Sequence, residues 1–163
     1  IPKGQLEAFY DVCFECGLAY DSSVYPIRGR RYGIPDGPTQ PKVVRKDVSR
    51  QLVELPVATA AWAGRIWPVG GGGSWRLLPG FAVSGFLASM NREGRIGVTY
   101  LHPYEFDSRS LSAVSAAGWS IRSIHHGLRQ NLRRGSLYAK LDALLDRFRF
   151  VCAAAYLDEA KGV

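Results

Sequence analysis

The first regular pattern along the chain is an apolar stripe near its N-terminus. Leu6, Phe9, Tyr10 and Cys13 follow one another at helical spacing, and Gly17 is a residue that can end a helix. A second helix is predicted over residues 78–92, where a proline opens the first turn and a glycine follows the last. The sequence therefore predicts at least two helices before residue 93.

Three short segments have the composition of strands. Residues 18–20 and 52–57 are predicted strands, the second of them limited by Pro56. Residues 96–101 are apolar and β-branched on both faces, which is typical of a parallel strand covered by helices. Because a helix directly precedes this segment, the sequence predicts an α/β fold with parallel strands.

The chain changes character after Asp107. Residues 108–120 are rich in Ser and Ala, residues 121–134 are basic, an amphipathic helix is predicted over 137–147, and a short final strand over 148–151. We therefore expect two parts, residues 1–107 and a C-terminal extension, residues 108–163. Within the first part, the Pro- and Gly-rich residues 24–42 form a long loop, and such loops inside a compact domain are usually functional.

Charge and composition narrow the function classes only slightly. The chain has 163 residues, a net charge of +7 and a pI near 9.6, which leaves nucleic acid, acidic glycans and membrane surfaces open as partners. The arginines form small groups rather than one dense block, so a solvated face is favoured and nucleic acid is not expected. No apolar run reaches the ~20 residues of a membrane helix, so no membrane segment is expected. The cysteines, being three in number, do not suggest a disulfide framework or a four-ligand zinc site.

His102 is the first candidate for chemistry. It directly follows the predicted strand 96–101, and Pro103 turns the chain out of that strand. Ligands of α/β folds bind outside the carboxyl ends of parallel strands, where a histidine can act as a general acid or base. A structural histidine that caps the strand end remains an alternative. Asp21 follows another short strand and could orient such a histidine, although Asp-Ser-Ser is also ordinary turn chemistry.

A run of four glycines, residues 70–73, precedes the other candidates. No Gly-Lys-Ser/Thr follows it, so a nucleotide-binding P-loop is excluded, but glycines let backbone approach a ligand closely. Trp75 and Arg76 could offer a stacking face and a charge there, with core packing as the alternative for Trp75. His125 and His126 lie in the basic segment without a nearby carboxylate, so surface positions are favoured over metal binding.

Several spaced segments together resemble the bacterial polysaccharide deacetylases, and in particular the subgroup found with exopolysaccharide and exosortase loci. The resemblance covers residues 5–107 and extends to residues 137–157. It rests on Gly17-Leu18-Ala19-Tyr20-Asp21-Ser22-Ser23-Val24-Tyr25-Pro26-Ile27-Arg28, Arg31-Tyr32-Gly33-Ile34-Pro35-Asp36, Pro68-Val69-Gly70-Gly71-Gly72-Gly73, Arg76-Leu77-Leu78-Pro79, Asn91-Arg92-Glu93-Gly94 and Tyr100-Leu101-His102-Pro103-Tyr104-Glu105.

The resemblance implies a fold and a chemistry. The fold would be part of an irregular (β/α) barrel with a helical C-terminal extension, and the activity would be removal of acetyl groups from N-acetylated sugars. In that family a divalent metal, often zinc, activates water, and a histidine of a Leu-His motif protonates the leaving amine. By this resemblance His102 would be the general acid, Asp21 its supporting carboxylate, and Trp75, Arg76 and Tyr104 contacts to the glycan.

The same resemblance places the metal-binding motifs upstream of Ile1, because no matching pattern occurs in this chain. We therefore expect no metal on this chain, a divalent metal in a longer parent protein, and no activity for the chain alone. Open strand edges would call for an N-terminal partner fragment or a homo-oligomer. The compartment would be the bacterial cytoplasm or periplasm. A non-catalytic carbohydrate-binding module is the alternative function, and nucleic-acid binding ranks last.

Overall fold

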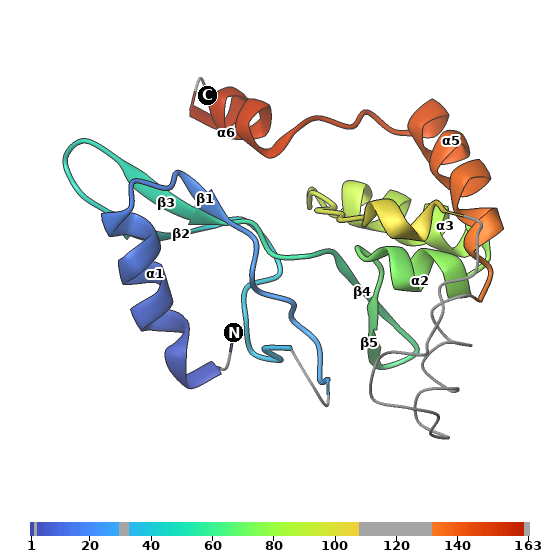
Figure 1. Ribbon diagram of the computed structural model, residues 1–163, viewed down its shortest axis with the longest axis horizontal. Coiled ribbons are helices and arrows are strands. Elements are labelled where there is room, and N and C mark those ends of the chain that lie inside the picture. Colours follow the sequence, from blue (N-terminus) through green and yellow to red (C-terminus); the bar gives the residue numbers. More distant parts are fainter. Residues whose placement is uncertain (2, 30–32, 108–131, 162–163) are drawn as a thin grey trace.

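The computed structural model describes residues 1, 3–29, 33–107 and 132–161 (Figure 1). The helices are α1 (Leu6–Glu15), α2 (Gly72–Leu77), α3 (Gly80–Arg92), α5 (Leu137–Arg147) and α6 (Ala153–Lys161). The strands are β1 (Tyr20–Asp21), β2 (Lys42–Lys46), β3 (Gln51–Glu54), β4 (Thr59–Trp62) and β5 (Arg65–Pro68). Three 3-10 helices are also present: η1 (Lys3–Gln5), η2 (Pro103–Glu105) and η3 (Arg134–Ser136).

The larger sheet has the order β1-β3-β2, with β1 parallel and β2 antiparallel to β3. Parallel pairing continues beyond β3, because the Val57 amide donates to the carbonyl of Val24 at 2.9 Å. On its other side the same segment meets residues 98–100, where the Ala58 amide donates to the Val98 carbonyl at 2.9 Å. Residues 53–58 therefore lie between two parallel neighbours, residues 19–24 and 98–100.

The hairpin of β4 and β5 interrupts this central segment. Its tip, Ala63-Gly64, has positive φ angles of 52° and 71°, the geometry that a two-residue hairpin turn requires. After the hairpin the chain returns to its starting point, since the Gly70 amide donates to the Ala58 carbonyl at 2.9 Å. Gly71 then forms a parallel bridge with Tyr100. The glycine run thus continues the parallel pairing with residues 98–100 that begins at Val57.

Two helices cover opposite faces of the sheet at β3 (Figure 1). Leu52 packs with Tyr10 and Cys13 of α1, whereas Val53 packs with Leu157 of α6. This alternation is the period of two that a strand buried on both faces must have. The apolar stripe predicted for the N-terminal helix is confirmed as the face that packs on the sheet.

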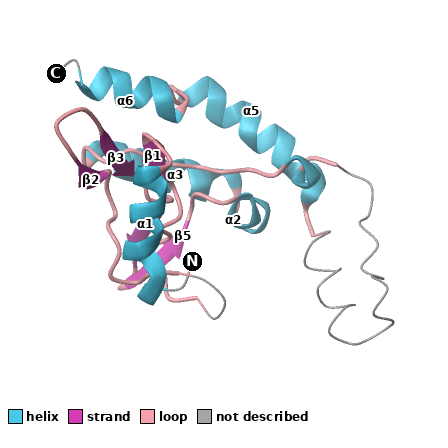
Figure 2. Cartoon of the chain, turned by 60° about the vertical axis from the view of Figure 1, so that its left-hand side comes forward, coloured by secondary structure: helices cyan, strands magenta, loops and turns pink. Residues whose placement is uncertain are grey.

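A third core joins the two parts of the chain. Leu137 and Leu144 of α5 are buried in the same cluster as Trp75 of α2 and Val83 of α3. Figure 2 shows α5 and α6 following one another along one side of the molecule. The described part of the expected C-terminal extension therefore shares its apolar core with the preceding residues.

The predicted helices at 78–92 and 137–147 are confirmed as α3 and α5, and the predicted strand at 52–57 is represented by β3. The segment 96–101 is parallel as predicted, but it forms isolated bridges and is only half-buried, because α6 and the segment before it cover it incompletely. The final strand predicted at 148–151 is wrong, since these residues link α5 to α6 outside any strand. The described residues form a mixed α/β structure with small sheets, and the (β/α) barrel stays a prediction.

Candidate functional site

His102 lies on an exposed turn directly after the parallel segment 98–100. Its imidazole is stacked on the ring of Tyr104, with centroids 5.3 Å apart and planes inclined by 16°. The ring of Tyr100 meets it edge-on at 5.5 Å. The two tyrosines therefore hold the imidazole between them while it remains open to solvent, as a proton donor to an external substrate must be.

The turn is held from beneath by Glu105, whose side chain is only 2% exposed. The amide of His102 donates to Glu105 Oε2 at 3.0 Å, and the amide of Glu105 donates to the carbonyl of His102 at 2.9 Å. These reciprocal bonds follow the spacing of a capping box, with Glu105 three residues after the N-cap position of η2. The backbone of His102 is thereby fixed at both of its polar groups.

Arg76 supplies the positive charge opposite Glu105. The guanidinium Nε lies 3.5 Å from Glu105 Oε1, and both side chains are buried, at 9% and 2% exposure. A buried carboxylate is tolerated when a cation pairs with it. Arg76 is buried and its charge is turned inward toward Glu105. This position disfavours the glycan contact predicted for it.

Trp75 requires a correction. Its side chain is fully buried, and its indole N–H donates to the carbonyl of Val69 at 2.7 Å. A ring with no exposed face cannot stack on a sugar, so the alternative of core packing holds for Trp75. Tyr104 differs, because 41% of it is exposed and its glycan contact remains a prediction.

Asp21 lies at the end of β1, in a different environment from His102. Its carboxylate accepts hydrogen bonds from the amide of Ser23 at 3.1 Å and from the hydroxyl of Ser23 at 2.9 Å. The strand order puts residues 53–58 between β1 and the segment that carries His102. No described contact joins Asp21 to His102, and the supporting role predicted for Asp21 has no geometric basis among the described residues.

Glu54 forms an unexpected partner for Asp21. Its side chain is fully buried, accepts from the Tyr10 hydroxyl at 3.0 Å and from the Val24 amide at 3.0 Å, and is also hydrogen-bonded to Asp21. Burial is the largest effect and raises the pKa of Glu54 to about 8, although the Val24 amide opposes this shift. Burial and the neighbouring Glu54 likewise raise the pKa of Tyr10. Burial therefore favours the protonated form of the Glu54 carboxyl group over the carboxylate.

The metal ligands that the resemblance implies are not found in the described residues. Among them no three His, Cys, Asp or Glu side chains are grouped so that they could hold an ion. The exposed His102 ring has the aromatic rings of Tyr100 and Tyr104 as neighbours. The described residues of this chain therefore offer no grouping that fits a metal centre.

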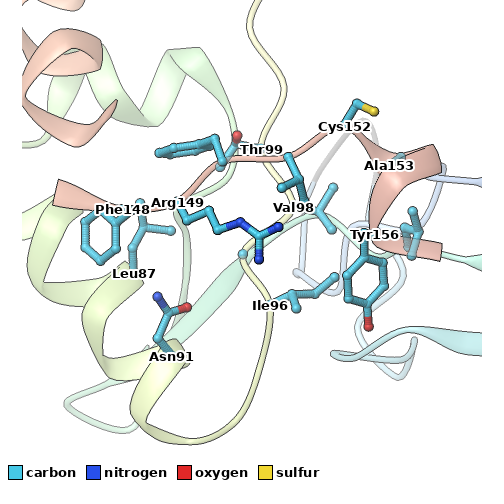
Figure 3. Close-up of a pocket in the computed structure, with 14 residues that line it drawn as sticks. Leu87, Asn91, Ile96, Val98, Thr99, Phe148, Arg149, Cys152, Ala153 and Tyr156 are labelled. Atoms are coloured by element: carbon cyan, nitrogen blue, oxygen red, sulfur yellow. The ribbon is translucent and has the colours of Figure 1, made fainter. Parts of the chain in front are cut away.

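A cavity of about 370 Å³ lies away from this site, between α3, residues 96–99 and the link from α5 to α6 (Figure 3). Figure 3 shows many apolar side chains around it, together with the polar groups of Asn91, Thr99, Arg149 and Tyr156. Arg149 is ion-paired with Glu159 of α6. The cavity lacks the convergent polar groups that mark a specific small-molecule site.

The remaining polar candidates are placed as follows. His125 and His126 lie outside the described residues, as does most of the basic segment.

Sequence reasoning missed Glu105 and Glu54 as site residues. The spacing of His102 and Glu105 was a usable signal, because a carboxylate three residues after a turn opening is typical of a capping box.

The described helices include none with the length and apolar character needed to cross a bilayer. Residues 22–158 match the family model of a domain of unknown function, DUF3473. No curated protein and no solved structure matches the chain significantly. The match covers the turn of His102, the glycine run, α5 and most of α6.

Proposed function

Since the chain belongs to the DUF3473 family, a domain found in polysaccharide deacetylase-associated proteins, we propose that it is the C-terminal part of such a deacetylase. The reaction would be hydrolysis of N-acetyl groups on a glycan of exopolysaccharide metabolism. The observation that supports this most is the exposed imidazole of His102, held between two tyrosines at the end of a parallel segment.

In this proposal the chain contributes the proton-donating half of the site. The protonated imidazole of His102 would transfer a proton to the leaving amine nitrogen as the amide C–N bond breaks. Tyr104, exposed beside it, would contact the sugar ring. The divalent metal, expected to be zinc, would activate water in the longer parent protein, and the described residues of this chain would not bind it.

Acetate release tests the proposal directly. The gene product that contains this chain and the chain alone are each incubated with zinc and oligomers of N-acetylglucosamine. The longer product is expected to release acetate, whereas the chain alone is expected to release none. Acetate from the chain alone would contradict the assignment of the metal to the parent, and none from either protein would contradict the deacetylase.

A carbohydrate-binding module remains the second candidate, because aromatic side chains are exposed on the hairpin as well. Trp62 is 61% exposed and lies 5.9 Å from the ring of Trp67, with Arg65 paired to Trp62 across the strands. Aromatic faces bind the C–H surfaces of sugars without any chemistry. Saturable binding of the oligomers by both proteins, lost in Trp62→Ala and unaccompanied by acetate release, would favour the module.

A further inference from the structure

The turn that carries His102 is exposed, yet its backbone is held by hydrogen bonds. Glu105 accepts from the amide of His102 at 3.0 Å and donates its own amide to the carbonyl of His102 at 2.9 Å. An exposed residue on an unanchored loop would sample many orientations. Here the two bonds close the turn, and the Glu105 side chain lies below it at 2% exposure.

The pocket for this carboxylate is built by two residues of α2. Arg76 provides the charge, with Nε 3.5 Å from Glu105 Oε1. Gly72 provides the space, because a Cβ atom added there would lie 2.5 Å from Glu105 Cδ and closer still to Oε2. The carboxylate therefore rests directly on the Gly72 backbone, and a side chain at this position would displace it.

A third contact comes from the C-terminal part of the chain. Arg134 of η3 is 4% exposed, and its guanidinium donates to the carbonyl of Tyr104. The same Tyr104 stacks its ring on His102. One buried cation thus fixes the backbone of the stacking tyrosine, while Glu105 fixes the backbone of the histidine.

We propose that Glu105 is a positioning residue for His102, supported by Arg76 and Arg134, and that it takes the supporting place assigned to Asp21 by the sequence. The inference rests on the proposed deacetylase function. Glu105 acts through the backbone, since its carboxylate binds the His102 amide and leaves the ring free to meet substrate. General acid catalysis needs the donor within hydrogen-bond reach of the leaving atom, and small misplacements are costly.

The kinetic test uses the longer gene product with N-acetylglucosamine oligomers as the probe. Glu105→Gln keeps the shape of the side chain and removes its charge, so kcat is expected to fall on the order of 100-fold with KM little changed. Glu93→Gln is the matched control, because Glu93 is an exposed carboxylate at the end of α3 and its kcat is expected to equal that of the wild type. An unchanged kcat for Glu105→Gln would overturn the inference.

The folded fraction separates positioning from simple loss of folded protein. Urea unfolding gives the fraction of Glu105→Gln that is folded, and the observed kcat is divided by that fraction. The kcat per folded molecule is expected to stay on the order of 100-fold below that of the wild type. A corrected kcat equal to that of the wild type would overturn the positioning role.

A measurement on the chain alone keeps the inference apart from the proposed function. Exchange of the His102 amide hydrogen, followed by NMR, is expected to be at least 10-fold faster in Glu105→Ala than in the wild type, while amides of α1 are unchanged. If Glu105→Ala does not fold, Glu105→Gln replaces it. Equal exchange would overturn the positioning contact. Faster exchange without acetate release by the longer product would retain the contact and refute the deacetylase.

Discussion

Gly72 and Gly73 are adjacent residues of α2 that the structure treats very differently. A Cβ atom at Gly72 would lie 2.5 Å from the carboxyl carbon of Glu105, whereas one at Gly73 would find its nearest neighbour, an Arg76 nitrogen, at 3.9 Å. Neither glycine has a positive φ angle, so alanine is compatible with the backbone at both positions. A comparison of alanine variants at Gly72 and Gly73 therefore tests whether Glu105 occupies the space over Gly72.

The expected loss of stability in Gly72→Ala follows from the contacts that the Glu105 carboxylate would lose. To accept a Cβ atom, Glu105 has to move by more than 1 Å, which breaks its bond to the His102 amide and separates it from Arg76. Disrupting a buried ion pair typically costs about 3–5 kcal/mol, and alanine's helix propensity returns up to about 1 kcal/mol. Gly72→Ala should thus destabilise the chain by roughly 3 kcal/mol.

Urea unfolding of the chain, followed by circular dichroism, measures this difference. Gly73→Ala is expected to be as stable as the wild type or up to about 1 kcal/mol more stable, because it gains only the helix propensity. The midpoint should shift without a change in the slope of the transition. Equal stability of the two alanine variants would show that Glu105 does not occupy the space over Gly72, and the account of the His102 turn would fail.

Three further outcomes follow from buried groups. Because the pKa of Glu54 is raised, the folded state loses stability as pH rises from about 4.5 to about 8. Glu54→Gln cannot ionise, so it should be more stable than the wild type by on the order of 4 kcal/mol at pH 8.5 and nearly equal to it at pH 4. Urea unfolding at each pH measures this difference. Lys140 donates to carbonyls at the end of α2 at 2.8 and 2.9 Å, so Lys140→Met should cost about 1–3 kcal/mol, measured in the same way; no loss would contradict the cap. Cys16 and Cys152 are exposed and should react with iodoacetamide in the native state, whereas mass spectrometry should find Cys13, whose thiol pKa is raised by burial, unmodified.

The helices of this chain could be predicted because their signals are local. The stripe from Leu6 to Cys13 and the opening proline of the segment before α3 are contained within one or two turns. The hairpin of β4 and β5 was not predicted from the sequence. Its turn depends on positive φ angles at Ala63 and Gly64, and alanine gives no warning of that conformation.

Of the residues in the candidate site, His102 could be predicted because its sequence signal is local. His102 was found because a strand end and a following proline mark it in the sequence. The neighbours of His102 and Asp21 depend on tertiary packing: Glu105 meets Arg76 across 29 positions, and Glu54 meets Tyr10 across 44. Composition also cannot separate a buried tryptophan from an exposed one, so the burial of Trp75 and the exposure of Trp62 could not be predicted.

The central claim is that His102 donates a proton in deacetylation, and one substitution tests it most directly. His102→Gln in the longer gene product removes the titrating group but keeps a side chain of similar size beside Tyr104. Acetate release from N-acetylglucosamine oligomers should lose on the order of 100-fold in kcat, with KM little changed. A variant that releases acetate at the wild-type rate would contradict the claim.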